Sequence, residues 1–294
     1  MTEAIPDKKH RRGWLLLKCL FTATAVSFII MKADLKQIWH DLQIVSPPYV
    51  LIAFIFLNIG QVVSALRMRY YFAGAGLMMS KKFSILFYFA GNFFNLLLPG
   101  GIGGDGYKAY LLKKLKDFPV LQGVRLILSG RASGLLLLVL ISLILALFSP
   151  TVRVFPFAIP LITGAFFVSI AGYSILAKLL LKEKLKTQIG AAGYSFFVQI
   201  LVLITGYLLF KGANVGGGMV DYLLLFMTSS IVSILPISMG GVGLRELTFF
   251  KGAPLFGLSP ELGIAIAIIY FFINSLSSLI GLLFIPRLKH MIER

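Results

Sequence analysis

Long apolar runs dominate this amino-acid sequence and limit the folds that it can adopt. Each run is 15 to 25 residues long, and the short segments between them hold most of the charges. A helix of about 20 apolar residues crosses the hydrocarbon core of a bilayer. Hydrophobic residues make up 58% of the chain and charged residues 13%, against about 45–50% and about 25% in an ordinary soluble domain. These features predict an all-α integral membrane protein with a single membrane domain over 1–294. They exclude a soluble enzyme, a disordered chain and a free nucleic-acid-binding protein.

Residues that bind metals or form disulfides are scarce. Cys19 is the one cysteine, so an intrachain disulfide is excluded, and the three histidines are scattered near the predicted membrane edges. We therefore expect no metal and no cofactor. The net charge of +17 could suggest nucleic acid, but the basic residues form short clusters between apolar runs. Such clusters are typical of membrane loops that obey the positive-inside rule, so no nucleic-acid partner is expected.

The first run, 14–31, follows the basic segment 8–12 and resembles a signal peptide. It is longer than the usual apolar region of about 7–15 residues, and further spans follow it. We interpret it as an uncleaved first span with a cytoplasmic N-terminus. Residues 34–46 carry apolar side chains at helical spacing, which predicts a short helix in the membrane interface with Trp39 at headgroup level.

Two of the apolar runs are short and broken. The runs 83–98 and 221–235 end in segments rich in Pro and Gly, and 107–115 and 244–250 after them could be helical again. Such interruptions are the pattern of discontinuous or re-entrant helices. The sequence therefore predicts re-entrant helical hairpins over about 83–115 and 221–250. The six remaining runs are the predicted full spans: 14–31, 49–66, 132–148, 155–177, 189–210 and 261–285.

The distribution of basic residues favours this topology. Two re-entrant hairpins leave 21 Lys and Arg in the cytoplasmic loops and 6 outside, whereas two full crossings give 13 and 14. The positive-inside rule expects the first distribution. We therefore expect six full transmembrane helices plus two hairpins, with the N- and C-termini in the cytoplasm.

The two breaks share the pattern P-x3-G-G-x-G-x-[K/R] at a constant offset of 137 residues. The same offset brings the spans of about 14–148 onto those of about 155–285. Each half then has three crossings, an odd number, so the second half lies inverted relative to the first. Inverted repeats with broken helices are characteristic of transporters whose site lies near the midplane. The predicted hairpin-turn residues are Pro99, Gly103, Gly104, Gly106, Pro236, Gly240, Gly241 and Gly243.

The segment 101–106 also fits G-x-G-x-x-G, but a dinucleotide fingerprint needs a preceding strand, and here an apolar run precedes it. We interpret these glycines as tight turns where the backbone packs against backbone or ligand. New half-helices are expected to start near Gly106 and Gly243. Their free N–H groups and positive dipole ends would favour an anion in the membrane centre.

Lys108 and Arg245 occupy equivalent positions in the two breaks, with Asp105 and Glu246 beside them. An ionisable group within a bilayer costs about 2.5–3.5 kcal/mol on insertion scales, so it usually has a partner or a function. One hypothesis is that the bases attract a lipid phosphate while the acids orient them or couple to protons. The other is that the pairs lock the hairpin arms together, or that Lys108 extends to the cytoplasmic surface.

Other polar residues have less specific interpretations. Arg125 and Arg131 precede the span 132–148; Arg131 either faces the first hairpin or extends to the interface, as we expect for Arg125. Asp221 and Glu261 lie near predicted outer ends and are expected to be solvated. The amides within the spans are expected mostly to bond between helices, some of them lining a path: Asn58, Gln61, Asn92, Asn95, Gln199 and Asn274.

The residues at the two breaks resemble a known family. The segments 91–95 and 98–105, then Arg131, then 236–246 with the pattern P-x-S-x-G-G-x-G-x-R-E, look like the transmembrane domain of lysylphosphatidylglycerol synthases. They are also similar to stand-alone flippase-like membrane proteins of bacteria and archaea. The resemblance covers nearly the whole chain. It implies that Asp105, Arg131, Arg245 and Glu246 lie in a central cavity.

In bifunctional relatives this domain moves aminoacylated phosphatidylglycerol to the outer leaflet, and a separate soluble domain performs the aminoacyl transfer. This sequence contains no such domain, so the resemblance does not imply synthase activity here. Other relatives are linked to glycolipid or hopanoid pathways, so the resemblance leaves the lipid open.

We expect a lipid flippase in the cytoplasmic (inner) membrane that moves an anionic phospholipid, polyprenyl lipid or glycolipid between leaflets. The alternative is a non-catalytic lipid-binding subunit that recruits a glycosyl- or aminoacyl-transferase. A channel is disfavoured because the hairpin charges are mixed in sign, and an enzyme because no nucleophile–base pair is evident. The expected partner is a lipid with a phosphate headgroup; a transferase and a homo-oligomer are further options. The expected substrate-binding residues are Asp105, Lys108, Arg131, Arg245 and Glu246.

Overall fold

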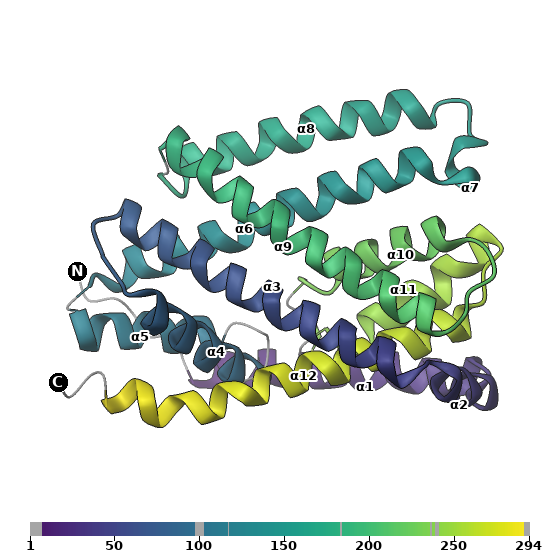
Figure 1. Cartoon of the computed structure of the whole chain (residues 1–294), viewed down its shortest axis with the longest axis horizontal. Coiled ribbons are helices and arrows are strands. Elements are labelled where there is room, and N and C mark those ends of the chain that lie inside the picture. The colour runs from purple at the N-terminus through teal and green to yellow at the C-terminus, as the bar shows by residue number, and fades with distance from the viewer. Residues whose placement is uncertain are drawn as a thin grey trace.

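The computed structural model describes the backbone of residues 8–97, 103–116, 118–182, 184–235, 237–238 and 241–290. Side chains are described within these ranges from residue 17 onward, apart from positions 97, 115, 116, 289 and 290. Every regular element of the described part is a helix (Figure 1). The elements are α1 (Lys8–Lys32), α2 (Leu35–Ile44), α3 (Pro47–Gly74), α4 (Lys81–Leu97), α5 (Gly103–Lys116), α6 (Val120–Phe148), α7 (Pro150–Arg153), α8 (Ala158–Leu179), α9 (Leu185–Gly212), α10 (Met219–Val232), α11 (Leu244–Gly252), η1 (Ala253–Phe256) and α12 (Pro260–His290).

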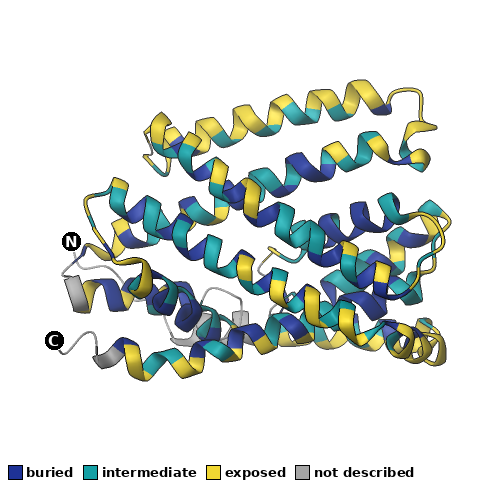
Figure 2. Cartoon of the chain, in the orientation of Figure 1, coloured by how far each residue is buried: buried dark blue, intermediate teal, exposed yellow. Residues whose placement is uncertain are grey.

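Five helices, α3, α6, α8, α9 and α12, are long and apolar enough to cross a membrane. They coincide with five of the six predicted spans; the sixth, 14–31, lies in α1, whose side chains are described only in part. Their outer faces stay exposed, and only 6% of the most apolar stretch of α8 is buried inside the protein (Figure 2). An apolar exterior of this extent is matched by lipid rather than by water. The chain is a multi-pass helical membrane protein.

The buried apolar residues form two clusters, one at each end of the molecule. One contains Met79, Phe118 and Leu288, and thus gathers the ends of α3, α5 and α12 near the two chain termini (Figure 1). The other contains Val45 and Ala253, and gathers α2, α10, α11 and the start of α12. Helix α12 runs from one end to the other, so it contacts both clusters.

Two pairs of shorter helices are antiparallel hairpins. In the first, Gly104 of α5 lies against Asn95 of α4, whereas Lys108, one turn later, lies against Gly91. This order of contacts shows that α5 returns along α4. In the second hairpin, Gly241 lies near Ser233, and Gly252 at the end of α11 meets Leu225 of α10. Each hairpin thus begins and ends at the same end of the molecule.

The helix boundaries follow the offset of 137 residues in the core of each half. Shifted by 137, α3 becomes 184–211, and α9 is Leu185–Gly212. Likewise α4 becomes 218–234, against Met219–Val232 for α10. Helices α3 and α9 pack along one another in the middle of the molecule (Figure 1). The two related spans therefore form the central pair to which both hairpins are attached.

Two helices are longer than the sequence predicts. Helix α3 continues past residue 66 to Gly74, so Arg67 and Arg69 are helical rather than part of a cytoplasmic loop. Helix α6 begins at Val120, so Arg125 and Arg131 lie within it instead of preceding it. Arginine has high helix propensity, and its long stem can lie along apolar neighbours, so a charge alone does not end a span.

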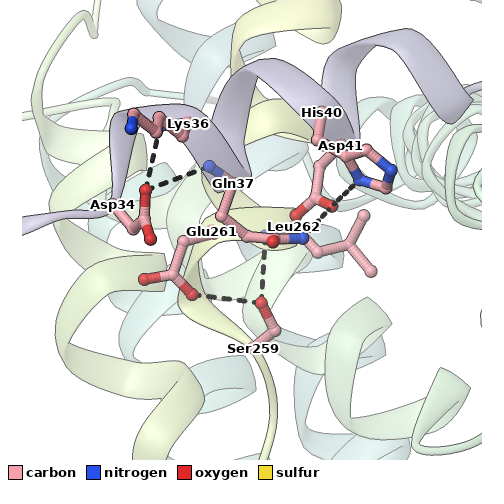
Figure 3. A network of polar contacts seen from close by, with 8 residues as sticks. All are labelled: Asp34, Lys36, Gln37, His40, Asp41, Ser259, Glu261 and Leu262. Atoms are coloured by element: carbon pink, nitrogen blue, oxygen red, sulfur yellow. Dashed lines mark hydrogen bonds and ion pairs between the residues drawn. The ribbon is translucent and has the colours of Figure 1, made fainter.

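The predicted interface helix is present as α2. The carboxylate of Asp34 caps it by accepting hydrogen bonds from the backbone N–H groups of Lys36 and Gln37, at 2.9 and 3.1 Å. Ile38 is buried against the core, whereas Trp39 on the opposite side is exposed. Its position at headgroup level stays a prediction. Figure 3 shows how α2 lies over the start of α12, with Ser259 and Glu261 below it.

Candidate functional site

A cavity of about 190 Å³ lies between the first hairpin and helices α3 and α6. Three of the five predicted site residues line it: Asp105 and Lys108 from α5, and Arg131 from α6. A fourth charged residue, Arg67 from α3, faces the same space. Asn92 and Asn95 of α4 complete the polar part of its wall.

Asp105 binds two of these cations. Its Oδ2 lies 2.6 Å from Nε of Arg131, and its Oδ1 lies 3.5 Å from Nζ of Lys108. Asp105 occupies the first turn of α5, where the positive end of the helix dipole favours a carboxylate. The carboxylate is therefore held from two sides, and the hairpin is connected to α6 through the Arg131 pair.

Lys108 is enclosed by the hairpin. Only 3% of its surface is exposed, and Nζ lies 4.5 Å from the centroid of the Tyr88 ring, a cation–π distance. Its aliphatic stem runs against Gly91, where a larger residue would overlap with it. The hypothesis that Lys108 extends to the cytoplasmic surface is therefore wrong. The absence of a side chain at Gly91 gives the lysine its place.

Arg67 is a site residue that sequence reasoning missed. It is 8% exposed, and its Nη1 donates a hydrogen bond of 3.0 Å to Ser195 of α9. Ser195 in turn donates to Ser133 of α6, which fixes the serine from the far side. Nε of Arg67 has no hydrogen-bond partner among the described residues. The signal in the sequence was the aromatic continuation after Arg67 through Tyr70, Tyr71 and Phe72, which is unusual for a loop.

The cavity thus holds three cations and one carboxylate. Buried charges are costly unless they are paired, and a single carboxylate cannot neutralise three positive groups. Arg131 retains access to the outside, since 40% of its side chain is exposed, whereas Arg67 and Lys108 are enclosed. This arrangement is suited to an anion that enters past Arg131 and meets the inner cations.

The two remaining predicted residues line a different, smaller cavity of about 30 Å³ beside the second hairpin. The guanidinium of Arg245 lies 4.3 Å from the Tyr270 ring centroid and 5.4 Å from that of Phe226. Its Nη1 is buried without a hydrogen-bond partner in the described part of the chain. Glu246 turns back to accept a hydrogen bond of 2.7 Å from the backbone N–H of Gly243, so it caps α11.

A row of amide side chains joins the two cavities. Asn92 lines the first cavity and donates to Gln61 of α3 at 2.9 Å. Gln61 donates to Asn274 of α12 at 3.5 Å, and Asn274 lines the second cavity. The prediction that span amides bond mostly between helices is confirmed here, and Asn58 with Ser277 and Gln199 with Gly134 are further examples.

The predicted hairpin-turn residues divide into three groups. Gly103, Gly104 and Gly106 are not in the turn but in the first turn of α5, which begins three residues before the predicted start at Gly106. Asn95 stabilises this early start by accepting a hydrogen bond of 2.8 Å from the Gly104 N–H. Gly241 and Gly243 do precede α11, both with φ of +84°, a conformation that favours glycine. Pro99, Pro236 and Gly240 lie outside the described residues.

Asp221 corrects another expectation, because it is buried rather than solvated. Its carboxylate accepts hydrogen bonds from Ser149, at the end of α6, and from Thr151 of α7. Glu261 is half-buried and accepts a hydrogen bond of 3.2 Å from Ser259 (Figure 3). Within the ranges that the structure describes, no three His, Cys, Asp or Glu residues come together in a way that could hold a metal ion.

Comparison with known proteins adds the family. The sequence matches the family described as Lysylphosphatidylglycerol synthase TM region over residues 15–189 and 177–281. The chain belongs to this family. No curated protein matches the chain. Membership in the lysylphosphatidylglycerol synthase TM region family agrees with the helical membrane architecture, and it covers both hairpins and both cavities.

The resemblance implied that Asp105, Arg131, Arg245 and Glu246 share a central cavity. In this member of the lysylphosphatidylglycerol synthase TM region family, Asp105 and Arg131 line one cavity, and Arg245 and Glu246 line another. The amide row connects the two groups. The described geometry is therefore two linked polar sites of unequal charge rather than one chamber.

Proposed function

We propose that the protein is a lipid translocase of the cytoplasmic membrane, and that it moves an anionic phospholipid or a polyprenyl- or glycolipid between the leaflets. The observation that supports this best is the cavity with Arg67, Lys108 and Arg131 around a single carboxylate. Cations of this number inside a membrane domain require a counter-charge, and a lipid phosphate would supply it. The acyl chains would stay in the surrounding bilayer while the headgroup crosses inside the protein.

We propose further that six helices cross the membrane, that both hairpins are re-entrant, and that both chain termini face the cytoplasm. Lys81, Lys182 and Arg287 belong to the end of the molecule where the termini lie (Figure 1). The opposite end carries acidic residues, among them Asp34, Asp41 and Glu261. This distribution favours a cytoplasmic position for the basic end.

The proposed transport step begins with exchange at Asp105. A phosphate that enters past Arg131 would compete with the carboxylate for Arg131 and Lys108, since both are held by the same two oxygens. Releasing Arg131 from Asp105 would also loosen the contact between the first hairpin and α6. The two inverted halves would then alternate access around the central α3–α9 pair. No covalent step is required, so we propose no catalytic activity and no cofactor.

The proposal is tested by reconstituting the protein in liposomes with an acyl-labelled fluorescent phosphatidylglycerol and measuring how much label a membrane-impermeant quencher reaches. We expect wild-type protein to move the lipid and Lys108→Ala/Arg245→Ala to slow it at least tenfold. Lys113→Ala, which alters an exposed lysine of the same helix α5, should transport like wild type. An unchanged rate in a correctly folded double variant would contradict the assignment of these cations.

Lipids that co-purify with the protein give an independent measurement. One phosphate-bearing lipid should be enriched over the bulk membrane in wild type and lost from the double variant. If neither protein transports lipid and a transferase co-purifies in fixed ratio, the alternative function applies. The protein would then be a lipid-binding subunit that recruits a glycosyl- or aminoacyl-transferase.

A further inference from the structure

The carboxylates near the two cavities are already engaged. Asp105 contacts Lys108 and Arg131, and Glu246 accepts the Gly243 N–H that begins α11. These are the acidic residues that line the two cavities in the described part of the chain. A headgroup with an ammonium group would therefore meet cations on several sides and find no open carboxylate.

The path between the cavities has a different chemistry. Asn92, Gln61 and Asn274 are uncharged, and each side chain can both donate and accept hydrogen bonds. The bond from Gln61 to Asn274 is long, at 3.5 Å, so it is the weakest connection of the row. A hydroxyl group can replace such a bond by accepting from one amide and donating to the next.

We propose that the translocated lipid is a phosphodiester whose headgroup beyond the phosphate is uncharged and carries hydroxyl groups, and that the site rejects headgroups with an ammonium group. The phosphate is bound by Arg67, Lys108 and Arg131, and the hydroxyls exchange with the amide row formed by Asn92, Gln61 and Asn274. This inference rests on the proposed function for its transport step. The selectivity itself is a property of binding and is measured without transport.

Aminoacylated lipids are disfavoured by the same reasoning. An aminoacyl group adds an ammonium to the headgroup and removes the hydroxyl to which it is esterified. Both changes act against the residues of this site, since the first adds repulsion by the three cations and the second removes a partner for the amide row. The inferred substrate class is therefore the hydroxylated, anionic lipid rather than its aminoacylated product.

The experiment is native mass spectrometry of the purified full-length protein with four lipids of identical acyl chains. Phosphatidylglycerol carries hydroxyls, phosphatidylpropanol lacks them, phosphatidylethanolamine carries an ammonium, and N-acetyl-phosphatidylethanolamine has that charge removed. We expect phosphatidylglycerol to bind at least tenfold more tightly than phosphatidylethanolamine, and N-acetylation to restore most of the difference. Phosphatidylpropanol should bind about threefold more weakly than phosphatidylglycerol, a difference of about 0.65 kcal/mol.

Two variants separate the site from the general basic charge of the chain. Gln61→Leu should abolish the difference between phosphatidylglycerol and phosphatidylpropanol while keeping the rejection of phosphatidylethanolamine. Lys113→Gln, on the exposed face of α5, should keep both preferences. If Gln61→Leu does not fold, Asn274→Leu tests the same row, and the wild-type lipid series stands without either variant.

The inference is overturned if phosphatidylethanolamine binds as tightly as its N-acetylated form, or if the hydroxyl preference is absent in wild type. Either result leaves the translocase proposal intact whenever liposome transport is observed. Conversely, selective binding with no transport supports the inferred headgroup class and contradicts the translocase. The two proposals therefore fail in distinguishable ways.

Discussion

Gly134 of α6 provides the space that the guanidinium of Arg67 occupies. A Cβ atom at residue 134 would lie 2.9 Å from Nη1 and 3.6 Å from Nη2 of that arginine. The hydrogen bond to Ser195 holds the guanidinium from the other side, so it cannot withdraw without losing its partner. The direction of this buried cation toward the cavity thus depends on a missing side chain on a neighbouring helix.

Gly134→Ala should therefore weaken anionic lipid binding without removing any charge. We expect the guanidinium to shift and the affinity for phosphatidylglycerol to fall by about 1 kcal/mol, or about fivefold. Titration by native mass spectrometry measures the change. Gly172→Ala on α8 is the matched control, because nothing lies within 4 Å of the added atom. Equal affinities in the two variants would remove Arg67 from the site.

The crossing of α4 and α5 predicts a difference between neighbouring glycines. A Cβ at Gly104 would overlap with the backbone carbonyl of Gly91, whereas nothing lies within 4 Å of a Cβ at Gly106. Gly104→Ala should destabilise the protein by about 1–3 kcal/mol, since backbone cannot move aside cheaply. Gly106→Ala should be neutral or stabilising by up to about 1 kcal/mol. Thermal unfolding in detergent compares them, and the same transition temperature in both would contradict this crossing.

The buried carboxylate at the other end predicts a second stability effect. Asp221→Ala leaves the hydroxyls of Ser149 and Thr151 without their acceptor, which should cost about 1–3 kcal/mol. Glu261→Ala, beside the exposed Ser259, should change stability by less than about 0.5 kcal/mol. Denaturation of the two variants under identical conditions tests the contrast. A mild effect at Asp221 would mean that water replaces the carboxylate.

Labelling of single cysteines tests the proposed topology. In a Cys19→Ser background, Lys82→Cys and Lys182→Cys should react with an impermeant reagent from one side of the membrane, and Asn214→Cys from the other. All three positions are exposed. If both hairpins were full crossings, residues 82 and 182 would react from opposite sides. Transport by each variant serves as the control for correct folding.

The positions of most helices could be predicted from the sequence because lipid imposes a simple rule. A helix that crosses the bilayer must satisfy its backbone internally and present apolar side chains over its length. This rule located α3, α6, α8, α9 and α12, and the Pro–Gly breaks located both hairpins. Helix ends were less accurate, since Arg67 and Arg131 are charged residues that continue a helix rather than end it.

The composition of the site was harder to predict. An offset of 137 residues shows that Lys108 and Arg245 are equivalent, but equivalence in an inverted repeat does not mean proximity, and the two line different cavities. The partner of Asp105 also depends on how α5 and α6 pack. Arg131 is 26 positions away in the sequence, and no local pattern predicts an ion pair over that separation.

The unequal charge of the two cavities has an energetic consequence for a moving anion. The site with Arg67, Lys108 and Arg131 would hold a phosphate more strongly than the one with Arg245 alone, so a lipid rests preferentially at one stage of its passage. Moving one elementary charge through 100 mV is worth about 2.3 kcal/mol. If the three-cation site is the one nearer the cytoplasm, an interior-negative membrane would push the anion away from its resting place. The resting potential of the cell could then supply the work of release.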